Sequence, residues 1–269
     1  MESLRYSIFD PTGNITALVE SEVPVEAQPG AAARIMAAQP SVEQVGFVSF
    51  GGELPALRMA GGEFCGNASM SAAALCLLRN GKTGGSVSLR VSGAAEPVEI
   101  RLREESPACF SAGVRMPPAL GLEQRSFSFG GLSGQLPLAR MQGISHIIIP
   151  GDSCFALLRQ NREEAERAVR LWCAEITAEG LGLMFLEGDC LTPLVYVPGS
   201  GTVFWENSCA SGSAAAAMVL AQEAMRHVSI TWREPAGSLR VECDPGSGVT
   251  WLWGRTRLVG EYKEKKREA

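Results

Sequence analysis

Two cysteines of this chain stand in similar surroundings and could carry out acid–base chemistry. Cys65 and Cys209 each follow an acidic residue closely, and each opens a run of small residues. The two runs are predicted to form helices over residues 67–78 and 210–226,. Because a helix N-terminus carries partial positive charge and free N–H groups, it favours a thiolate. The sequence therefore predicts a pair of thiols that face one substrate.

The elements that must position these cysteines are predicted to recur along the chain. Short alternating strands precede and follow each small-residue helix, and a helix with one buried face is expected over residues 160–177,. The two small-residue helices carry almost no charge, so each should be buried on all sides. At the end of the chain, residues 249–253 and 255–262 are expected to form separate strands.

This order of elements predicts an α+β fold made of two halves, each a set of strands wrapped about one helix. The first half is expected over residues 1–118 and carries Cys65, and the second is expected over residues 119–269 and carries Cys209. The boundary is placed at the Pro117-Pro118 pair. Whether the last strand crosses back to the first half stays open at this point.

The composition bounds the class of protein. With 269 residues, 46% hydrophobic and 20% charged, the chain is expected to be globular with a sizeable core,. A net charge of −5 argues against a nucleic acid or a membrane surface as partner,. No apolar stretch could span a membrane and no secretory signal is evident, so a cytoplasmic location is expected,. The eight cysteines lack metal-ligand spacing, so no metal is expected, and a homodimer is kept open,.

The two cysteine loops carry a resemblance to a known superfamily. Cys65-Gly-Asn67 and Cys209-Ala-Ser-Gly-Ser213 resemble the Cys-Gly-Asn and Cys-Gly-Ser/Thr-Gly loops of the diaminopimelate epimerase / proline racemase superfamily. Weaker matches occur in the same order along the chain, at Gly13-Asn14, Glu43-Gln44, the segment from Gly143 to His146, and Glu206. The resemblance covers nearly the whole chain, and the paired cysteine loops are its most specific part.

The resemblance implies a fold and a mechanism. Members of this superfamily have two pseudo-symmetric domains, each a sheet rolled around a central helix, with the active site in the cleft between them. They are cofactor-independent racemases and epimerases of amino acids. One cysteine, as thiolate, removes the α-proton from one face of the substrate, and the other, as thiol, delivers a proton to the opposite face. The expected protein is thus an isomerase that needs no pyridoxal phosphate and whose substrate is a small molecule, an amino acid.

The resemblance also implies roles for other residues. His146 is expected to lie near one cysteine and Glu206 near the other, where they would tune the two thiols, while Asn14 and Gln44 would contact the substrate. Backbone N–H groups at the two helix starts could stabilise charge on the substrate carboxylate: those of Gly66, Asn67, Ala210, Ser211, Gly212 and Ser213,. Structural readings compete with these roles. His146 could be a histidine entering a strand, Glu206 an acid ahead of a helix, and Asn14 a left-handed turn residue.

Three departures from the family pattern bear on the substrate. Residues 57–63 contain no asparagine, Ile144 stands where diaminopimelate epimerases carry asparagine, and no arginine follows Glu206. These are the groups expected to hold the distal charges of diaminopimelate, so a site without them should reject that substrate. The interpretation is therefore a racemase for another amino acid. Histidine racemases of metallophore pathways share this general plan and are one candidate class.

Other functions within the same fold remain as alternatives. They are diaminopimelate epimerase proper, a 3-hydroxyproline dehydratase and a phenazine-biosynthesis-like isomerase. The last uses an acid and lacks the cysteine pair, so Cys65 and Cys209 argue against it. A non-catalytic amino-acid-binding protein is the alternative from another class. Exchange of the α-proton with solvent deuterium would separate an enzyme from a binding protein.

Overall fold

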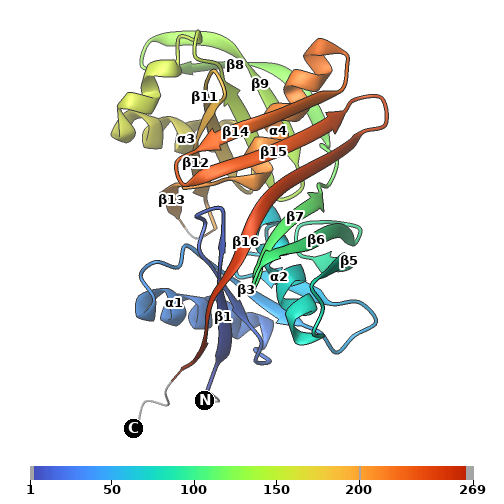
Figure 1. The fold of residues 1–269 in the computed structure, drawn as a ribbon. Helices are drawn as coiled ribbons and strands as arrows, with labels where there is room; N and C mark the ends of the chain where they lie inside the picture. The colour runs from blue at the N-terminus through green and yellow to red at the C-terminus, as the bar shows by residue number, and fades with distance from the viewer. Residues whose placement is uncertain (1–2, 200, 265–269) are drawn as a thin grey trace. The chain divides into compact units, whose positions relative to one another are not determined.

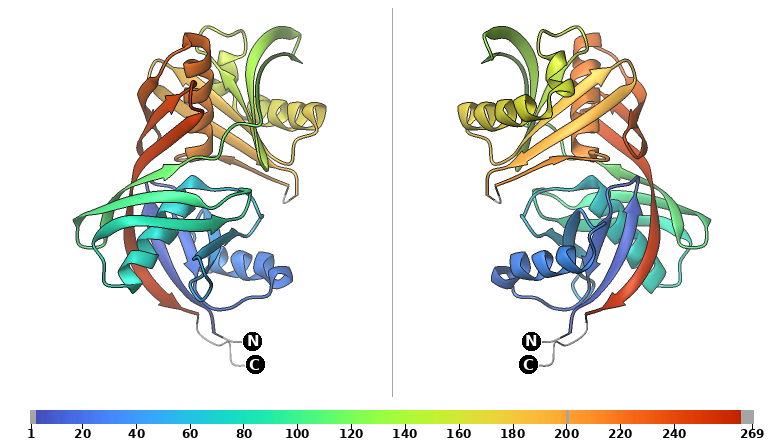
Figure 2. Two further views of the ribbon diagram at one scale, coloured as in Figure 1. Left: turned by 90° about the vertical axis from the view of Figure 1, so that its right-hand side faces the viewer. Right: turned by 90° about the vertical axis from the view of Figure 1, so that its left-hand side faces the viewer.

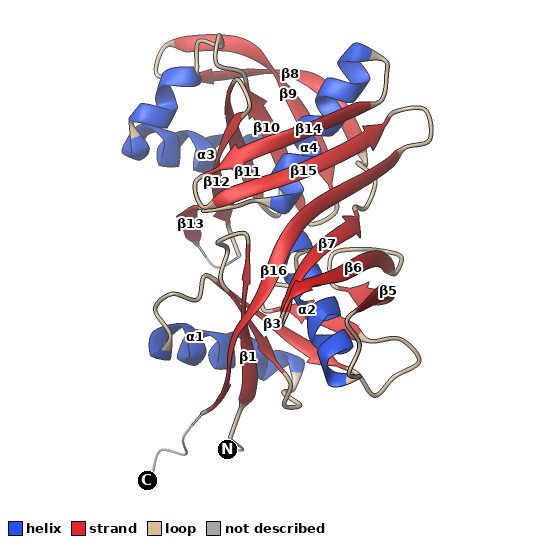
Figure 3. Ribbon diagram, in the orientation of Figure 1, coloured by secondary structure: helices blue, strands red, loops and turns tan. Residues whose placement is uncertain are grey.

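A computed structural model describes residues 3–199 and 201–264 of the chain, in which four α-helices accompany many strands (Figures 1 and 3). The chain divides into two compact units. Unit 1 comprises Met1–Arg115 and Trp253–Ala269, and unit 2 comprises Met116–Leu252. The fold is mixed α/β with few helices, and its strands in unit 1 close into a barrel. No helix among the described residues is both long enough and apolar enough to cross a membrane.

Unit 1 is a closed ring of strands around one helix. Its strands are β1 (Arg5–Pro11), β2 (Thr16–Val19), β3 (Gln44–Ser49), β4 (Ala56–Met59), β5 (Gly84–Val91), β6 (Val98–Ser106), β7 (Cys109–Arg115) and most of β16 (Val249–Lys263). They pair in that order, and β16 pairs again with β1 to close the ring. The β2–β3 and β4–β5 pairs are parallel, whereas the β1–β2, β3–β4, β5–β6 and β6–β7 pairs are antiparallel.

The helix inside unit 1 is α2 (Gly66–Arg79), which contacts β1, β2, β5, β6 and β7. Every residue from Gly66 to Leu75 is buried, as the uncharged run of small residues predicted,. The helix ends where Gly81 takes a left-handed conformation (φ +64°), close to the predicted end at residue 78,. A second helix, α1 (Gln28–Ala38), follows a short 3₁₀ turn η1 (Val25–Ala27) and packs on β3 (Figure 2).

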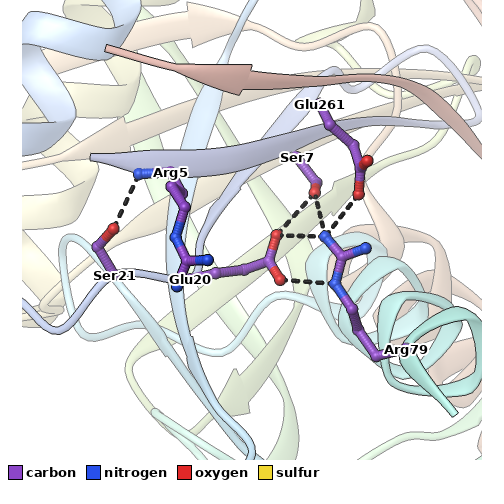
Figure 4. Close-up of polar contacts among 6 residues, drawn as sticks. All are labelled: Arg5, Ser7, Glu20, Ser21, Arg79 and Glu261. Carbon is purple, nitrogen blue, oxygen red and sulfur yellow. Dashed lines mark hydrogen bonds and ion pairs between the residues drawn. The ribbon is translucent and has the colours of Figure 1, made fainter. Parts of the chain in front are cut away.

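A polar clasp ties Arg79, at the end of α2, to Ser7 of β1, Glu261 of β16 and Glu20, the residue after β2 (Figure 4). Arg79 donates to both carboxylate oxygens of Glu20, at 2.7 and 2.8 Å, and also pairs with Glu261 of β16 at 2.5 Å. Ser7 of β1 donates to Glu20 at 2.9 Å. Partial burial raises the pKa of the Glu20 carboxyl, but the hydrogen bonds and charge of Arg79 outweigh it and leave that pKa below its ordinary value,. Ion pairs between charged Arg79 and the carboxylates of Glu20 and Glu261 therefore hold β16 and α2 together.

Unit 2 is built from further strands around a second buried helix. The strands are β8 (Gly121–Phe129), β9 (Leu132–Met141), β10 (Ile144–Ile149), β11 (Leu181–Glu187), β12 (Cys190–Val197), β13 (Thr202–Trp205), β14 (Val228–Glu234) and β15 (Gly237–Asp244). They pair in the order β8-β9-β10-β11-β12-β14-β15, with β13 beside β12. The β10–β11 and β12–β14 pairs are parallel, and the others are antiparallel.

The helix inside unit 2 is α4 (Ala210–Ala224), which contacts β9, β10, β11, β14 and β15. It ends at Ala224, two residues before the predicted end, and the next residue, Met225, has a left-handed backbone (φ +51°). Outside these strands, η2 (Ala156–Gln160) leads into α3 (Arg162–Ile176), which packs on β11 and β12. Trp172 lies fully buried on the inner face of α3 together with Ala165, Ala168 and Val169, as the sequence predicted,.

The end of the chain differs from the sequence-based expectation. The strands expected over residues 249–253 and 255–262 form one continuous strand, β16. Gly254 lies between them, but its φ is not positive, so it does not break the extended backbone,. The strand begins in unit 2 at Val249 and supplies the closing strand of unit 1 from Trp253 onward.

Candidate active site

Cys65 occupies the N-cap position of α2 in unit 1. Its backbone is extended (φ −134°, ψ 112°), and its Sγ accepts a hydrogen bond from the Ala68 N–H at 3.4 Å. Its carbonyl accepts from both the N–H of Ser69, at 2.9 Å, and the Ser69 hydroxyl, at 2.7 Å. The thiol is half-buried. The predicted placement of a cysteine sulfur at the start of a buried helix is therefore found in unit 1.

A glycine outside the helix fixes the approach to Cys65. Gly93 has a φ of +71°, and a Cβ added there would lie 2.2 Å from the backbone nitrogen of Phe64. Ser92, beside it, donates from its hydroxyl to the carbonyl of Glu63 at 2.9 Å. Only glycine combines the left-handed backbone with so close an approach. The turn after β5 thus holds the segment that leads into Cys65.

The side chain of Gln44, at the start of β3, reaches Cys65. Its Oε1 lies 3.2 Å from the Cys65 Sγ, and its Nε2 donates to the Thr16 hydroxyl at 2.7 Å. The Thr16 hydroxyl in turn donates to the carbonyl of Asn14 at 2.9 Å. Gln44 and Asn14, which the resemblance assigns to substrate contact, are thus joined with Cys65 in one chain of hydrogen bonds. Thr16 is a member of that chain that the sequence did not indicate.

The turn before β2 also decides one competing interpretation of Asn14. The left-handed residues there are Thr12 (φ +56°) and Gly13 (φ +85°), and Asn14 is not among the residues with positive φ. The reading of Asn14 as a left-handed turn residue is therefore wrong. Its side chain is buried, with an exposed fraction of 4%.

Cys209 occupies the N-cap position of α4 in unit 2, again with an extended backbone (φ −126°, ψ 98°). It is 5% exposed, and its side chain makes no capping hydrogen bond. The carboxyl group of Glu234, at the end of β14, lies beside the start of this helix. Glu234 accepts from the Cys209 N–H at 2.6 Å and from the Ser213 hydroxyl. The Gly212 N–H in the first turn of α4 acts on the Cys209 sulfur from the position that Ala68 holds in α2.

The surroundings of Cys209 favour its protonated form. Burial raises the pKa of the Cys209 thiol well above its ordinary value, and the charges of Glu206 and Glu234 and a hydrogen bond to Glu206 raise it further,. A hydrogen bond from the Gly212 N–H acts in the opposite direction and is outweighed. Burial also raises the pKa of Glu234 to about 8, although the hydrogen bonds from Ser213 and Cys209 lower it. This site is arranged to hold protons at neutral pH.

His146 of β10 approaches the same cysteine through Ser211. Its Nε2 lies 3.0 Å from the Ser211 hydroxyl, which lies 3.7 Å from the Cys209 Sγ. Full burial lowers the pKa of His146 to about 3, so the imidazole is neutral near pH 7,. The imidazole ring packs against Gly182 of the neighbouring strand β11. A larger residue would not fit there, because a Cβ on Gly182 would lie 2.4 Å from the His146 Nδ1.

The expected site residues thus fall into two groups, each described within its own unit. Unit 1 holds Cys65 with Asn14, Gln44, Gly66 and Asn67, and unit 2 holds Cys209 with His146, Glu206, Ala210, Ser211, Gly212 and Ser213. Within unit 2, His146 is linked to the Cys209 sulfur through Ser211, and Glu206 raises the pKa of the Cys209 thiol. No group of three or more His, Cys, Asp and Glu side chains suited to a metal ion occurs among the residues the structure describes.

Thr16 and Glu234 are the two members of these groups that sequence reasoning missed. Thr16 is 28 residues from Gln44, and Glu234 is 25 residues from Cys209. Thr16 is brought in by the pairing of β2 with β3, and Glu234 by the packing of β14 on α4. The only local signal for Glu234 was its place before Pro235 at the end of an alternating strand.

Comparison with known proteins gives a consistent family signal. A family model described as the histidine racemase CntK N-terminal domain matches residues 3–250. A histidine racemase of Fusobacterium nucleatum subsp. nucleatum (strain ATCC 23726) is 31% identical over 226 residues, which cover 80% of each chain. A histidine racemase of Staphylococcus aureus (strain Mu50) is 29% identical over 216 residues, covering 78% of this chain and 77% of the relative.

Solved structures share the fold at low sequence identity. A probable proline racemase from Agrobacterium radiobacter K84 has a TM-score of 0.72 at 13% identity, covering 98% of this chain and 93% of that one. A hydroxyproline epimerase from Agrobacterium vitis has a TM-score of 0.67 at 14% identity, covering 99% and 93%. At these identities the likeness concerns the fold alone.

Proposed function

This chain belongs to the histidine racemase family, and from that premise we propose that it interconverts the enantiomers of histidine with Cys65 and Cys209 as its two proton-transfer groups. Membership makes the chain an isomerase of the racemase and epimerase class, as the resemblance predicted. The observation that carries the proposal is that both cysteines occupy the N-cap position of a buried helix inside the region matched by the family model.

The proposed reaction moves one proton on and one proton off the same carbon. A thiolate takes the hydrogen from Cα and becomes a thiol, leaving a planar carbanion whose charge spreads onto the substrate carboxylate. A thiol on the opposite face then gives its proton to Cα and becomes a thiolate. The reverse reaction exchanges the two roles, so each cysteine must serve as base for one enantiomer and as acid for the other.

The surroundings of the sulfurs support a particular resting state. The N–H of Ala68 points at the half-buried Cys65 sulfur, whereas burial and the charge of Glu206 oppose ionisation of the Cys209 thiol. We therefore assign the resting thiolate to Cys65 and the resting thiol to Cys209. Glu206 would keep the Cys209 proton in place, and Ser211 would link that thiol to the neutral ring of His146.

The choice of histidine rests on the family and on what this chain lacks. The family model and the two curated relatives are histidine racemases by name. Diaminopimelate epimerases are expected to hold the distal amino acid group of their substrate with an asparagine and an arginine. This chain has Ile144 in place of that asparagine, and Asn207, not arginine, follows Glu206. The scheme uses no cofactor, because the two thiols and the helix N–H groups supply its acid, its base and its charge stabilisation.

A two-half architecture with one cysteine in each half is part of the proposal. Its support is the matching sequence of strand pairings: a parallel, an antiparallel, a parallel and an antiparallel pair follow one another from β2 to β6 and again from β10 to β15. The first half would be residues 1–118 with the returning end of β16, and the second the remainder. A cytoplasmic location and a homodimer are kept as proposals from the sequence.

The test is a panel of L-amino acids, incubated with the protein and read by chiral chromatography. Histidine should racemise fastest, and diaminopimelate should not turn over at a comparable rate. Cys65→Ala and Cys209→Ala should each lower the rate by about 10²–10⁴-fold, the usual contribution of a general acid or base. Cys154→Ala is the matched control, because that thiol is exposed and lies outside both groups.

The outcomes separate the alternative functions. Comparable turnover of diaminopimelate would make the chain an epimerase for that substrate. Loss of water from 3-hydroxyproline would indicate the dehydratase. Saturable binding of histidine without any change in its configuration would indicate a binding protein, and unchanged activity in both cysteine variants would refute the two-thiol mechanism.

A further inference from the structure

Both ends of the Gln44 amide are engaged within unit 1. The Oε1 faces the Cys65 sulfur at 3.2 Å, and the Nε2 faces the Thr16 hydroxyl at 2.7 Å. Thr16 is fully buried, and its hydroxyl donates a hydrogen bond to the Asn14 carbonyl at 2.9 Å. An amide held at both ends in this way is poorly placed to recognise a substrate, so its contacts call for another role.

The proposed reaction requires the hydrogen-bond partner of the Cys65 sulfur to suit two protonation states. In one half of the cycle Cys65 is a thiol, which donates a hydrogen bond, and in the other it is a thiolate, which only accepts. A fixed carbonyl would repel the thiolate, and a fixed donor would offer no acceptor to the thiol proton. A primary amide meets both states, because its oxygen and nitrogen ends have nearly the same shape and opposite hydrogen-bonding roles.

We propose that Gln44 and Thr16 form a reversible relay that follows the protonation state of Cys65. When Cys65 is a thiol, Sγ–H donates to Oε1, Nε2–H donates to Thr16, and Thr16 donates to the Asn14 carbonyl. When Cys65 is a thiolate, the amide turns by half a rotation, Nε2–H donates to the sulfur, and the Thr16 hydroxyl rotates to donate to Oε1. No proton leaves the relay in either direction, and only two torsions change.

Thr16 is suited to this role by the chemistry of its side chain. A hydroxyl can donate or accept, so it can match whichever end of the amide is presented to it. The parallel register sets Thr16 of β2 beside Gln44 of β3, so the two side chains are held next to each other by the strand pairing. The thiolate state gains a charge-assisted hydrogen bond from Nε2, which offsets the loss of the bond to Asn14.

Unit 2 contains a comparable arrangement behind Cys209. The Ser211 hydroxyl lies between the Cys209 sulfur and the His146 Nε2, and a neutral imidazole also has one donor and one acceptor nitrogen,. His146 is paired in parallel register with Gly182, as Thr16 is with Gln44. Each cysteine is therefore backed by neutral groups able to reverse their hydrogen bonds, which is the property the relay requires.

The relay rests on the proposed function for its purpose, but it can be tested without substrate. The probe is iodoacetamide, whose reaction with each cysteine is followed by peptide mapping from pH 5 to pH 10, since only the thiolate reacts. Thr16→Val keeps the shape of the side chain and removes its hydroxyl, whereas Thr16→Ser keeps the hydroxyl. The exposed thiol of Cys154 serves as an internal control in every sample.

The relay predicts that Thr16→Val moves the Cys65 alkylation midpoint to higher pH and lowers the reactive fraction at pH 7 by about tenfold, the effect of weakening one hydrogen bond to a charged group. Thr16→Ser should restore the wild-type profile, and Cys154 should not change. In racemase assays Thr16→Val should lower kcat in the direction that uses Cys65 as base, with KM within about twofold of wild type, a small change in binding energy.

Two results would overturn the relay. One is an unchanged Cys65 profile in Thr16→Val together with a raised KM, which would return Gln44 to substrate binding. The other is an equal loss in Thr16→Val and Thr16→Ser, which would indicate packing. If Thr16→Val does not fold, Gln44→Glu replaces it, because two acceptor oxygens should raise the alkylation midpoint further. Absence of racemase activity with the predicted alkylation shift would refute the function and not the relay.

Discussion

Cys65 and Cys209 share a position at a helix N-terminus but differ in what surrounds the sulfur. The Cys65 sulfur accepts an N–H from its own helix, and the Gln44 amide beside it can present its N–H to a thiolate by turning over,. The Cys209 sulfur is buried near the carboxyl groups of Glu206 and Glu234, and Glu234 accepts the Cys209 N–H. A two-base racemase has to start each turnover with one thiolate and one thiol. This difference supports that starting state without any metal or charged cofactor in the scheme.

Glu234 carries a pH prediction at this scale. Its pKa is raised to about 8 by burial, so the folded protein binds a proton that the unfolded chain has lost. Stability should therefore fall as pH rises from about 4.5 to about 8, by at most about 1.4 kcal/mol per pH unit. Glu234→Gln should remove this dependence, so that its melting temperature gains on wild type between pH 5 and pH 8.

The measurement is thermal unfolding at pH 5, 6, 7 and 8, with Glu223→Gln as control because that carboxylate is exposed near the end of α4. The same pH slope in Glu234→Gln and wild type would show that Glu234 is ionised throughout. In racemase assays the variant and wild type should agree below about pH 8 and diverge above it, where ionised Glu234 would further oppose ionisation of Cys209.

At the scale of the elements, the turn after β5 sets the position of Cys65. Gly93→Ala combines a left-handed backbone with a clash against Phe64, so it should lower the free energy of unfolding by at least about 3 kcal/mol,. Gly81→Ala is the matched control, because Gly81 is also left-handed (φ +64°) but has open space around it. It should cost only about 1 kcal/mol. Equal losses in urea unfolding would mean that the close approach at Gly93 is relieved at little cost.

The elements also show what local sequence can and cannot predict. The buried helices α2 and α4 were predictable, because an uncharged run of small residues after a capping position is a local signal. The placement of Cys65 and Cys209 followed from it. The hydrogen bonds of Thr16 to Gln44 and of Glu234 to Cys209 were not predictable, because strand pairing in the first case and packing of β14 on α4 in the second join residues more than twenty positions apart. The unbroken β16 was not predictable, because a glycine between two short alternating runs is typical of a strand end, although the backbone of Gly254 stays extended,.

At the scale of the whole molecule, the end of the chain completes the unit that begins it. Residues from Trp253 onward close the ring of unit 1 through β16, and Arg79 clasps Glu261 on that strand. A chain that ends at Leu252 should therefore lose hydrogen-exchange protection in β1 and β7, whose pairing partner is gone, while β9 to β12 of unit 2 stay protected. Loss of protection throughout would show that the units do not hold their structure separately. Full protection of β1 and β7 would contradict the closing role of β16.

The most direct test of the central claim follows the origin of the α-hydrogen during the first turnovers. L-Histidine is incubated with the protein in D₂O and stopped while only a small fraction has reacted, and both enantiomers are separated and analysed by mass spectrometry. Two thiols on opposite faces predict D-histidine that carries one α-deuterium and recovered L-histidine that carries none. Product that retains the original hydrogen, or deuterium in the recovered substrate before product accumulates, would contradict the roles assigned to Cys65 and Cys209.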